Sequence, residues 1–557
     1  MAWSIASWSS ERGLKALGAL FLPLFENLRR AELARDGERN ADGAAHHVPR
    51  LMLCAALGAL HQPPPRKTAS ERVRAMEIAI AMSPEDYRAH TSGAGQEGGF
   101  RYSGSFAGRN IEKIYALGGL EGSLEAAVLA CFAGPRRPEH VLVVSGFYVL
   151  HGRGGNPGTE PGVAAGSCET DGPLGALALL RAFAARGVRA SLYCEPHNGP
   201  VMRAGYEAML RHYDAAADDG SGHDGGGGAA RAMAARLRSH TRCLPDAPDR
   251  PVPGEDTAAY RAAYTSVFGG EAAGVPHQPE AVRCRAVRCA ASLGAAVAAA
   301  WRDEPVPPPP IDCLFAVERL GAPYRNIRGV DIAKHTEPID ALWPLASPPV
   351  GSAAAARLEA WLEGGEAAAG AAAAGAGAAQ GDIGAATAAL RSLAGVHPDA
   401  LSLAIGDGGN EVGMGRAVLA DEIAELSPGG EFAPLRVNGC YRGCDHLVAA
   451  TVSNWGGTAF EAAACVLCPQ EALDYRQQPQ RPGQQGAGQQ AQGEGAQGEE
   501  AQGAQVEEAV LAAIMAQPYG AVDGKYSEMA HAVDGLAWEP YHRELYEHLW
   551  RLAAAES

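Results

Sequence analysis

Leu401-Ser402-Leu403-Ala404-Ile405-Gly406-Asp407-Gly408-Gly409 is a short apolar run that ends abruptly in glycines and a carboxylate. The chain repeats this pattern, with apolar or β-branched runs that are each followed by polar and glycine-rich residues. The other runs are His140–Val149, Val188–Cys194, Ile311–Val317 and His446–Val452. Runs that are almost continuously apolar predict strands buried on both faces, as in a parallel sheet covered by helices.

Helical patterns separate most of these predicted strands. Within 175–186, for example, Leu177, Leu180 and Phe183 recur at the spacing of one helical face, and Gly187 follows as a helix stop. Alternating strands and helices indicate βαβ units. We therefore predict an α/β fold, a three-layer αβα arrangement with a mostly parallel, Rossmann-like sheet.

Composition divides the chain around this core. Residues 1–104 predict a helical N-terminal region of unknown role, and residues 105–550 hold the predicted α/β domain. Low-complexity insertions rich in Gly, Ala, Gln and Glu lie near 214–230, 351–385 and 476–506. We expect them to be disordered loops, because they carry too few large apolar side chains to build a core.

The bulk composition argues against several classes of function. The chain has 557 residues, with 47 Lys plus Arg against 64 Asp plus Glu, and this net charge of −17 disfavours a nucleic-acid partner. The longest apolar stretch near the start, Leu17–Phe25, is shorter than a membrane span and contains Pro23, so we expect no membrane partner. The chain shows no secretory signal pattern, and its twelve cysteines are expected to be reduced thiols.

Polar residues at the strand ends are the candidate site, because ligands of open parallel sheets bind beyond the carboxyl ends of the strands. Glu169 and Asp171 open the helix that follows the first run, where Thr170 or Asp171 would also suit a helix cap. Glu195 follows the second run and lies near His197 in another strand-end loop. The sequence leaves capping, surface and functional interpretations of these residues open.

A dense run of charge follows the third run, from Glu318-Arg319 to Tyr324-Arg325-Asn326-Ile327-Arg328-Gly329-Val330-Asp331. One interpretation is an internal ion-pair network. The other is an arginine that grips a substrate carboxylate through two parallel hydrogen bonds, for which Arg328 is favoured over Arg319 and Arg325.

The glycine loop 406–415 is the sharpest feature of the chain. Asp407 and Glu411 are oxygen donors four positions apart, suited either to a divalent cation or to proton transfer. Glycines such as Gly408 and Gly409 let backbone N–H groups approach a ligand. The loop lacks the Lys-Ser/Thr ending of a phosphate-binding P-loop, and a structural turn with solvated acids is the remaining alternative.

The last run ends in Ser453-Asn454-Trp455-Gly456-Gly457-Thr458, before a helix that we expect to begin near Ala459. Ser453 and Asn454 offer neutral hydrogen bonds to a ligand. Further on, Val522-Asp523-Gly524 recurs as Val533-Asp534-Gly535, which we interpret as paired turns without a function.

Several of these segments, in this order, resemble the C-terminal domain of the D-glutamate cyclase family. They are Phe106–Ile111, Glu169–Pro173, Asn326–Gly329 with Asp331-Ile332, Gly406–Glu411 and Ser453–Gly457. The resemblance covers roughly residues 105–545 once the insertions are discounted. It implies a lyase of the mitochondrial matrix or cytoplasm that converts D-glutamate to 5-oxo-D-proline and water, with D-glutamate as the small-molecule partner.

Lactam formation assigns hypothetical roles to the candidate residues. Arg328 would bind a substrate carboxylate, Asp407 or Glu411 would remove a proton from the ammonium, and Glu169 or Asp171 would protonate the departing oxygen. Gly408, Gly409 and Asn410 would stabilise the oxyanion. Further substrate-binding candidates are Glu318, Asn326, Asp331, Ser453 and Asn454.

The sequence requires no cofactor, and a divalent cation, Mn²⁺ or Mg²⁺, held by Asp407 and Glu411 is the alternative way to polarise the γ-carboxyl group. Two other functions stay open at this point. One is a metal-assisted phosphotransferase or hydrolase that acts on a nucleotide-like ligand. The other is a non-catalytic amino-acid-binding protein whose low-complexity tracts recruit partners. The residues do not indicate an oligomeric state.

Overall fold

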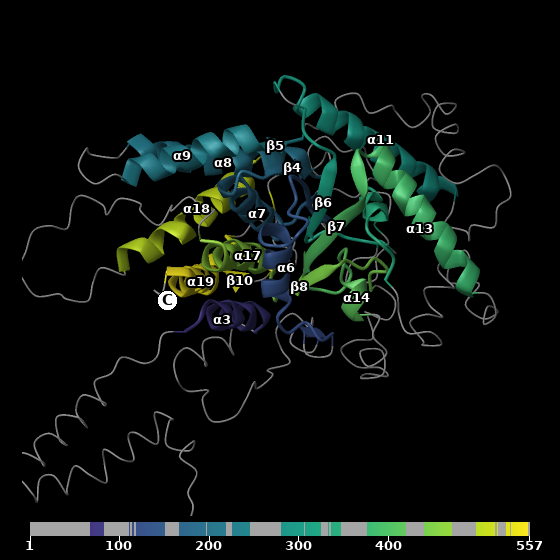
Figure 1. Ribbon diagram of the computed structural model, residues 1–557. Helices are drawn as coiled ribbons and strands as arrows, with labels where there is room; N and C mark the ends of the chain where they lie inside the picture. Colours follow the sequence, from purple (N-terminus) through teal and green to yellow (C-terminus); the bar gives the residue numbers. More distant parts are fainter. Residues whose placement is uncertain are drawn as a thin grey trace, which may run out of the picture. The chain divides into compact units, whose positions relative to one another are not determined.

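Six parallel strands form the central sheet, in the order β5-β4-β1-β6-β7-β8 (Figure 1). Their bounds are β1 His140–Ser145, β4 Arg189–Tyr193, β5 Thr241–Cys243, β6 Ile311–Val317, β7 Val396–Gly406 and β8 His446–Ala449. From β1 the chain first builds outward through β4 to β5, and then returns to place β6 on the other side of β1. The strand order therefore reverses between β1 and β6, the position at which doubly wound sheets bind ligands.

This computed structural model describes residues 67–82, 111, 114–115, 118–150, 166–195, 198–218, 226–244, 280–305, 307–322, 324, 332, 336–346, 376–418, 439–469, 497–517, 521, 531–534 and 536–554. Its helices are α3 Ala69–Ala81, α6 Ser123–Phe132, α7 Pro173–Ala185, α8 Gly199–Asp218, α9 Gly226–His240, α11 Glu280–Ala300, α13 Ala376–Leu393, α14 Gly415–Val418, α17 Ser453–Leu467, α18 Gln497–Met515 and α19 Arg543–Ala554. Short helical turns are η4 Ile339–Leu342 and η5 Trp538–His542. Two small antiparallel pairs join β2 Tyr148–Leu150 to β3 Gly166–Cys168 and β9 Ala532–Val533 to β10 Leu536–Ala537.

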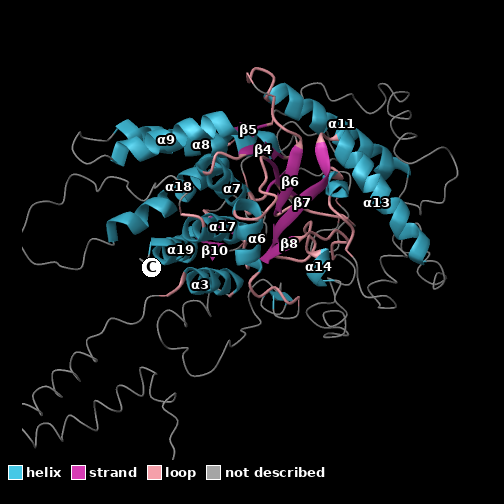
Figure 2. Cartoon of the chain, in the orientation of Figure 1, coloured by secondary structure: helices cyan, strands magenta, loops and turns pink. Residues whose placement is uncertain are grey.

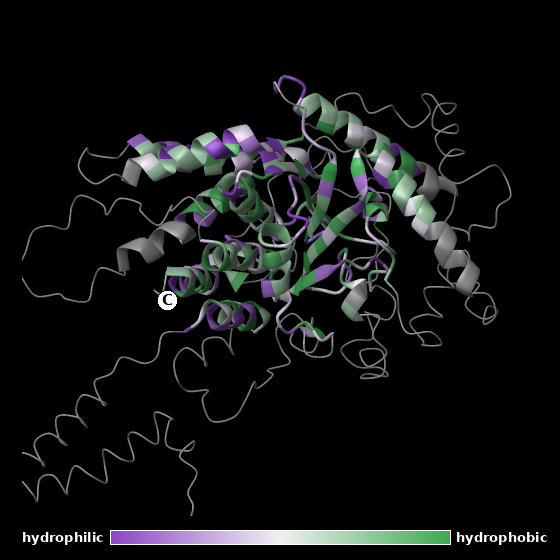
Figure 3. Ribbon diagram, viewed as in Figure 1, coloured by the Kyte–Doolittle hydropathy of each residue, from purple (hydrophilic) through white to green (hydrophobic). Residues whose placement is uncertain are grey.

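Helices cover both faces of the sheet, which confirms the predicted three-layer α/β fold (Figure 2). One layer contains α7 and α17, with α3, α6, α8, α9, α18 and α19 packed around them, and the other contains α11 and α13. Successive residues of β1 face opposite layers: Val141 and Val143 join the α7/α17 core, whereas Leu142 and Val144 join the α11/α13 core. The strands are accordingly among the most hydrophobic segments in Figure 3, as expected for strands that meet water on neither face.

The predicted strands lie where the structure has β1, β4, β6, β7 and β8, with ends that differ by a few residues. The pattern missed β5, because a strand of three residues with Arg242 at its centre has no apolar run. The helix α17 begins at Ser453 and not near Ala459, so that expectation was wrong. The reason lies in a cap supplied from elsewhere in the chain, which is described below.

The predicted insertions lie partly outside the described residues, at 219–225, 351–375 and 470–496. Their described ends are helical and not loops: α8 continues to Asp218, α9 begins at Gly226, α13 begins at Ala376 and α18 begins at Gln497. Alanine is abundant in these segments and has the highest intrinsic helix propensity, so composition alone was a poor guide there.

Most of the predicted N-terminal region, 1–104, also lies outside the described residues. Its described part, α3, packs against α6, α17 and α19 and contributes Val73, Met76 and Ile80 to the core of the α7/α17 layer. No described helix combines the length and the apolarity that a membrane span requires.

Candidate functional site

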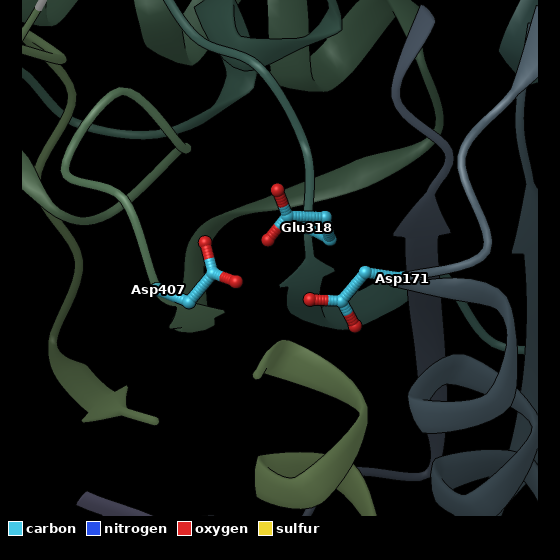
Figure 4. A group of neighbouring side chains, drawn as sticks. All are labelled: Asp171, Glu318 and Asp407. Carbon is cyan, nitrogen blue, oxygen red and sulfur yellow. The ribbon is translucent and has the colours of Figure 1, made fainter. Parts of the chain in front are cut away.

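Three carboxylates from separate segments, two of them at strand ends and one just before a helix, meet beside the point where the strand order reverses. Asp171 stands two residues before the start of α7, Glu318 follows β6, and Asp407 follows β7. One carboxylate oxygen from each lies within 4.8 Å of those of the other two, and all three side chains are buried. Figure 4 shows the three side chains directed toward one another from their three segments. We call Asp171, Glu318 and Asp407 the acid cluster.

Asp171 is held in place by the first residues of α17. Its Oδ1 accepts hydrogen bonds from the backbone N–H groups of Gly172 (2.9 Å) and Asn454 (2.8 Å), and its Oδ2 accepts one from Ser453 N–H (2.9 Å). A carboxylate at this position caps the helix and meets the positive end of its dipole. This is why α17 begins at Ser453, although no residue just before Ser453 supplies a capping side chain.

Asn454 caps α7 in return. Its Oδ1 accepts from the N–H groups of Gly172 and Gly175, both at 2.9 Å, and its Nδ2 donates to Thr170 O at 3.0 Å. Each helix therefore receives its cap from a residue at or just before the start of the other helix. Asp171 is therefore a helix cap, but of α17 and not of α7, the helix that the sequence predicted it to cap. The same hydrogen bonds orient it within the acid cluster.

Two glycines allow the helices to approach closely enough for this exchange. A Cβ added to Gly457 of α17 would lie 2.4 Å from both Cα and O of Gly175 in α7. A Cβ added to Gly175 would lie 3.1 Å from Asn454 Cα and 3.2 Å from Ser453 O. Side chains at either position would push the start of α17 away from Asp171.

Burial raises the pKa of Asp171 to about 6, and the negative charge of Asp534 adds to the increase. Hydrogen bonds from Asp407 and from the backbone of Asn454 and Ser453 act in the opposite direction. Carboxylate oxygens of Asp171 and Asp407 lie within 4.8 Å of each other, so a proton on one of the two groups favours the ionised form of the other. Such a pair contains an acid and a base near neutral pH.

Glu318 reaches the cluster through an unusual backbone conformation. Its φ is 43°, in the left-handed region that costs a non-glycine residue about 1 to 3 kcal/mol. Its Oε2 accepts a hydrogen bond from Ser453 Oγ at 2.6 Å. Strain of this kind persists only where the surroundings hold it, and here it places a third carboxylate beside Asp171 and Asp407.

Glu411 is not part of the acid cluster, although the sequence paired it with Asp407. Its Oε2 accepts the backbone N–H groups of Gly408 (3.1 Å) and Gly409 (2.8 Å), and its own backbone pairs with Leu320. The carboxylate therefore closes the glycine loop. These two amides are occupied, so the structure gives no support to the predicted oxyanion site at Gly408 and Gly409, and Asn410 is buried in the same loop with its O accepting Gly321 N–H.

The other predicted site residues divide into two groups. Glu169 is buried but is not among the three carboxylates of the acid cluster. Arg319 is buried in an ion pair with Glu195, and its Nη2 donates to Glu337 O at 2.6 Å, as the ion-pair interpretation requires. Arg325, Asn326, Arg328 and Asp331 lie outside the described residues.

Asp534 is a residue near the site that the sequence did not assign to it. It is buried, has a φ of 58° and lies close enough to Asp171 to raise its pKa. The segment around it is anchored to α17, because Trp455 Nε1 donates to His542 Nδ1 at 2.8 Å and His542 Nε2 hydrogen bonds with Val533 O at 3.3 Å. Its sequence resembles an ordinary Val-Asp-Gly turn, so only tertiary contacts could reveal it.

The acid cluster also has the composition of a site for a hard divalent cation. Carboxylate oxygens are the ligands that Mg²⁺ and Mn²⁺ prefer, and three of them converge here without a nitrogen or sulfur ligand. Glu318 and Asp171, and not Glu411, are therefore the carboxylates that lie beside Asp407 for binding a cation. The arrangement can serve proton transfer or cation binding.

Comparison with known proteins adds one finding. A family model described as D-glutamate cyclase-like, C-terminal, matches residues 104–353 and 365–550, which is most of the chain and includes the whole acid cluster. Curated protein sequences give no match.

Proposed function

Because the chain belongs to the D-glutamate cyclase-like family, we propose that it is a lyase that converts D-glutamate to 5-oxo-D-proline and water. The observation that carries the proposal is the acid cluster, in which buried carboxyl groups from three separate segments converge and burial raises the pKa of Asp171 to about 6. The location that goes with this activity is the mitochondrial matrix or the cytoplasm.

The reaction makes a bond between the α-nitrogen and the carbon of the γ-carboxyl group and breaks one bond from that carbon to oxygen. The substrate ammonium loses two protons in all, one before its nitrogen attacks and one after the new bond forms, and the departing carboxylate oxygen gains two to leave as water. In the Asp171–Asp407 pair, the ionised carboxylate accepts the two protons from nitrogen in turn, and the protonated carboxyl group donates in turn the two that the oxygen gains. The pair ends the reaction with the same number of protons, as a catalyst must.

Charge and burial both favour this assignment. The negative cluster attracts the ammonium group of the substrate, and the pKa of about 6 lets Asp171 carry a proton in a fraction of molecules near neutral pH. Glu318 is close enough to hold the ammonium beside the pair. Closure of a five-membered ring is intramolecular, so holding the substrate in a folded conformation supplies much of the rate.

A divalent cation would bind to the same three carboxylates. Bound there, Mg²⁺ or Mn²⁺ would supply a Lewis acid for the γ-carboxyl group. The residues would then act as ligands, with Ser453 Oγ and the N–H groups at the start of α17 holding Glu318 and Asp171 in orientation. A metal-assisted phosphotransferase or hydrolase would use the same ligands, which keeps that reaction as the second candidate.

Turnover by the purified full chain tests the proposal. The protein is incubated with D-glutamate and, separately, with L-glutamate, and 5-oxoproline is followed by chiral chromatography. We expect 5-oxo-D-proline from D-glutamate. No 5-oxoproline from either enantiomer, together with stabilisation by ATP and Mg²⁺ but not by D-glutamate, would favour the phosphotransferase.

Two variants and a chelator assign the chemistry. Asp407→Asn removes one member of the Asp171–Asp407 pair with little change in shape, and we expect it to abolish turnover. Asp303→Asn is the same chemical change at an exposed residue just beyond α11 and should leave turnover unchanged. Loss of activity in EDTA, restored by Mn²⁺ or Mg²⁺, assigns the cluster to a cation, whereas activity that persists in EDTA assigns it to proton transfer.

A further inference from the structure

Ser145, the last residue of β1, carries a buried hydroxyl group that the fold does not use. Its side chain is fully buried, and its Oγ has no hydrogen-bond partner among the residues that the structure describes. A buried polar group without a partner destabilises a fold, so each such group calls for an explanation. For Ser145, the surrounding residues support the explanation that its hydroxyl group binds a ligand.

Ser145 lies where the strand order reverses and next to the acid cluster. In the parallel pairing of β1 with β6 it is opposite Val317, the residue before Glu318. A Cβ added to Gly172 would lie 2.8 Å from Ser145 Oγ and 2.9 Å from Glu318 Cβ. The backbone that follows Asp171 therefore passes between Ser145 and Glu318, which places the hydroxyl group beside two members of the cluster.

Two further buried polar groups around the same strand end also have an unused atom. Arg319 Nη1 donates to Gly146 O at 3.3 Å, while its Nε has no partner among the described residues. Asn198 Nδ2 donates to Glu195 Oε2 at 3.3 Å, while its Oδ1 has none there. A Cβ added to Gly146 would lie 2.4 Å from Asn198 Nδ2, so this amide packs directly against the residue after Ser145.

The unused atoms match the groups of an acidic amino acid. The hydroxyl of Ser145 and the guanidinium N–H of Arg319 are donors, suited to carboxylate oxygens, and the Asn198 oxygen is an acceptor, suited to an ammonium. The acid cluster beside them repels carboxylates, so a substrate with two carboxylates needs donors of this kind at one end.

We propose that Ser145 is a substrate-binding residue whose Oγ donates a hydrogen bond to the α-carboxylate of the acidic amino acid, with Arg319 Nε as a second donor to that carboxylate and Asn198 Oδ1 as an acceptor for the neighbouring ammonium group. This inference rests on the proposed function and specifies how the substrate is held. The α-carboxylate binds at the end of β1, and the ammonium and γ-carboxyl groups face Asp171, Glu318 and Asp407.

Ser145→Ala tests the inference, because it removes the hydroxyl group and almost no volume. Two measurements are made on the full chain: kcat/KM with D-glutamate, and the increase in Tm caused by glutarate, an unreactive dicarboxylate. We expect a kcat/KM about tenfold lower, mainly through a higher KM, and a smaller glutarate effect. The Tm without ligand should be unchanged or higher, since no protein hydrogen bond is lost.

Ser191→Ala is the matched control in the neighbouring strand β4. Ser191 is equally buried, but its Oγ accepts from Trp301 Nε1 at 3.0 Å and hydrogen bonds with His140 Nε2 at 2.9 Å. We expect this variant to lower the Tm and to leave kcat/KM and the glutarate effect unchanged. The control separates loss of a buried hydroxyl group in general from loss of a ligand contact.

The outcomes distinguish this inference from the proposed function. If Ser145→Ala matches the wild type in both kcat/KM and the glutarate effect, the inference is wrong and the proposed function stands. If the wild type forms no 5-oxoproline but glutarate stabilises it in a Ser145-dependent way, the subsite stands and the proposed reaction is wrong. A wild type that shows neither turnover nor stabilisation contradicts both.

Discussion

Replacing Gly457 by alanine should separate α7 from α17 and disconnect the acid cluster from its support. The new Cβ would lie 2.4 Å from Cα and O of Gly175, whereas non-bonded carbon atoms rest about 3.5 to 4 Å apart. The helices must therefore part by about 1 Å. Overpacking of this size costs about 1 to 3 kcal/mol, and the better helix propensity of alanine returns roughly 1 kcal/mol.

The caps at this crossing add to the cost. Asp171 accepts two backbone hydrogen bonds from the start of α17, and a hydrogen bond to a charged group contributes about 1.5 to 3 kcal/mol. With one of them weakened, we expect Gly457→Ala to lower the free energy of unfolding by roughly 2 to 4 kcal/mol. A displacement of 1 Å at the cluster should also reduce kcat/KM about 100-fold.

Urea unfolding followed by circular dichroism measures the stability, and chromatography of 5-oxoproline measures kcat/KM. Gly384→Ala in α13 is the control, because nothing lies within 4 Å of its Cβ position. For this control we expect only the higher helix propensity of alanine to matter, so the free energy of unfolding should rise by up to about 1 kcal/mol and kcat/KM should not change. A Gly457→Ala protein as stable and as active as the wild type would refute the argument that this contact orients the site.

Three further expectations follow from the buried charges. If the protonated member of the Asp171–Asp407 pair donates to the leaving oxygen, kcat/KM should fall as the pH rises through about 6. A rise in kcat/KM over that range would instead indicate that the carboxylates must be ionised to hold a cation. Burial lowers the pKa of His542 from 6.5 to about 4, so the folded state holds the neutral ring and stability is lost as the pH falls from 6.5 toward 4. His542→Gln should reduce the difference in unfolding free energy between pH 7 and pH 5 by roughly 2 kcal/mol in urea melts. An unchanged difference would show that His542 is not the source of the pH dependence. Arg319→Met leaves Glu195 buried without its cation and should lower the free energy of unfolding by about 3 to 5 kcal/mol. Arg238→Met, in an exposed ion pair, should lower it by less than about 1 kcal/mol. Similar losses in the two variants would contradict this account of the buried pair.

The sheet could be predicted because its signal is local. The strand β6 and the second half of β7 are apolar at nearly every position, and both their faces must be covered, so the pattern 401–405 or 311–317 has few other physical solutions. The same argument predicted that the polar residues after each strand lie at the edge of the sheet where ligands bind. It could not predict β5, which depends on pairing with β4 and not on its own side chains.

The site could be predicted only in part. Glu318 and Asp407 follow the pattern of a carboxylate at a strand end, Asp171 that of a carboxylate before a helix, and the sequence named each of them. Spacing suggested Glu411 as the partner of Asp407, yet Glu411 binds the amides of its own loop. Sequence distance does not show which of two nearby carboxylates faces a site and which closes a turn.

By itself, the sequence determined the α/β class, the edge of the sheet at which chemistry gathers, and the residues available there, because strand burial and glycine-rich strand ends leave a signature in adjacent residues. Only the tertiary structure decided how those residues combine. Asp171 meets α17 across 282 positions of the chain, and Asp534 reaches the site from the C-terminal segment. Contacts of this kind depend on how helices cross and where a loop ends, and no pattern in neighbouring residues records them.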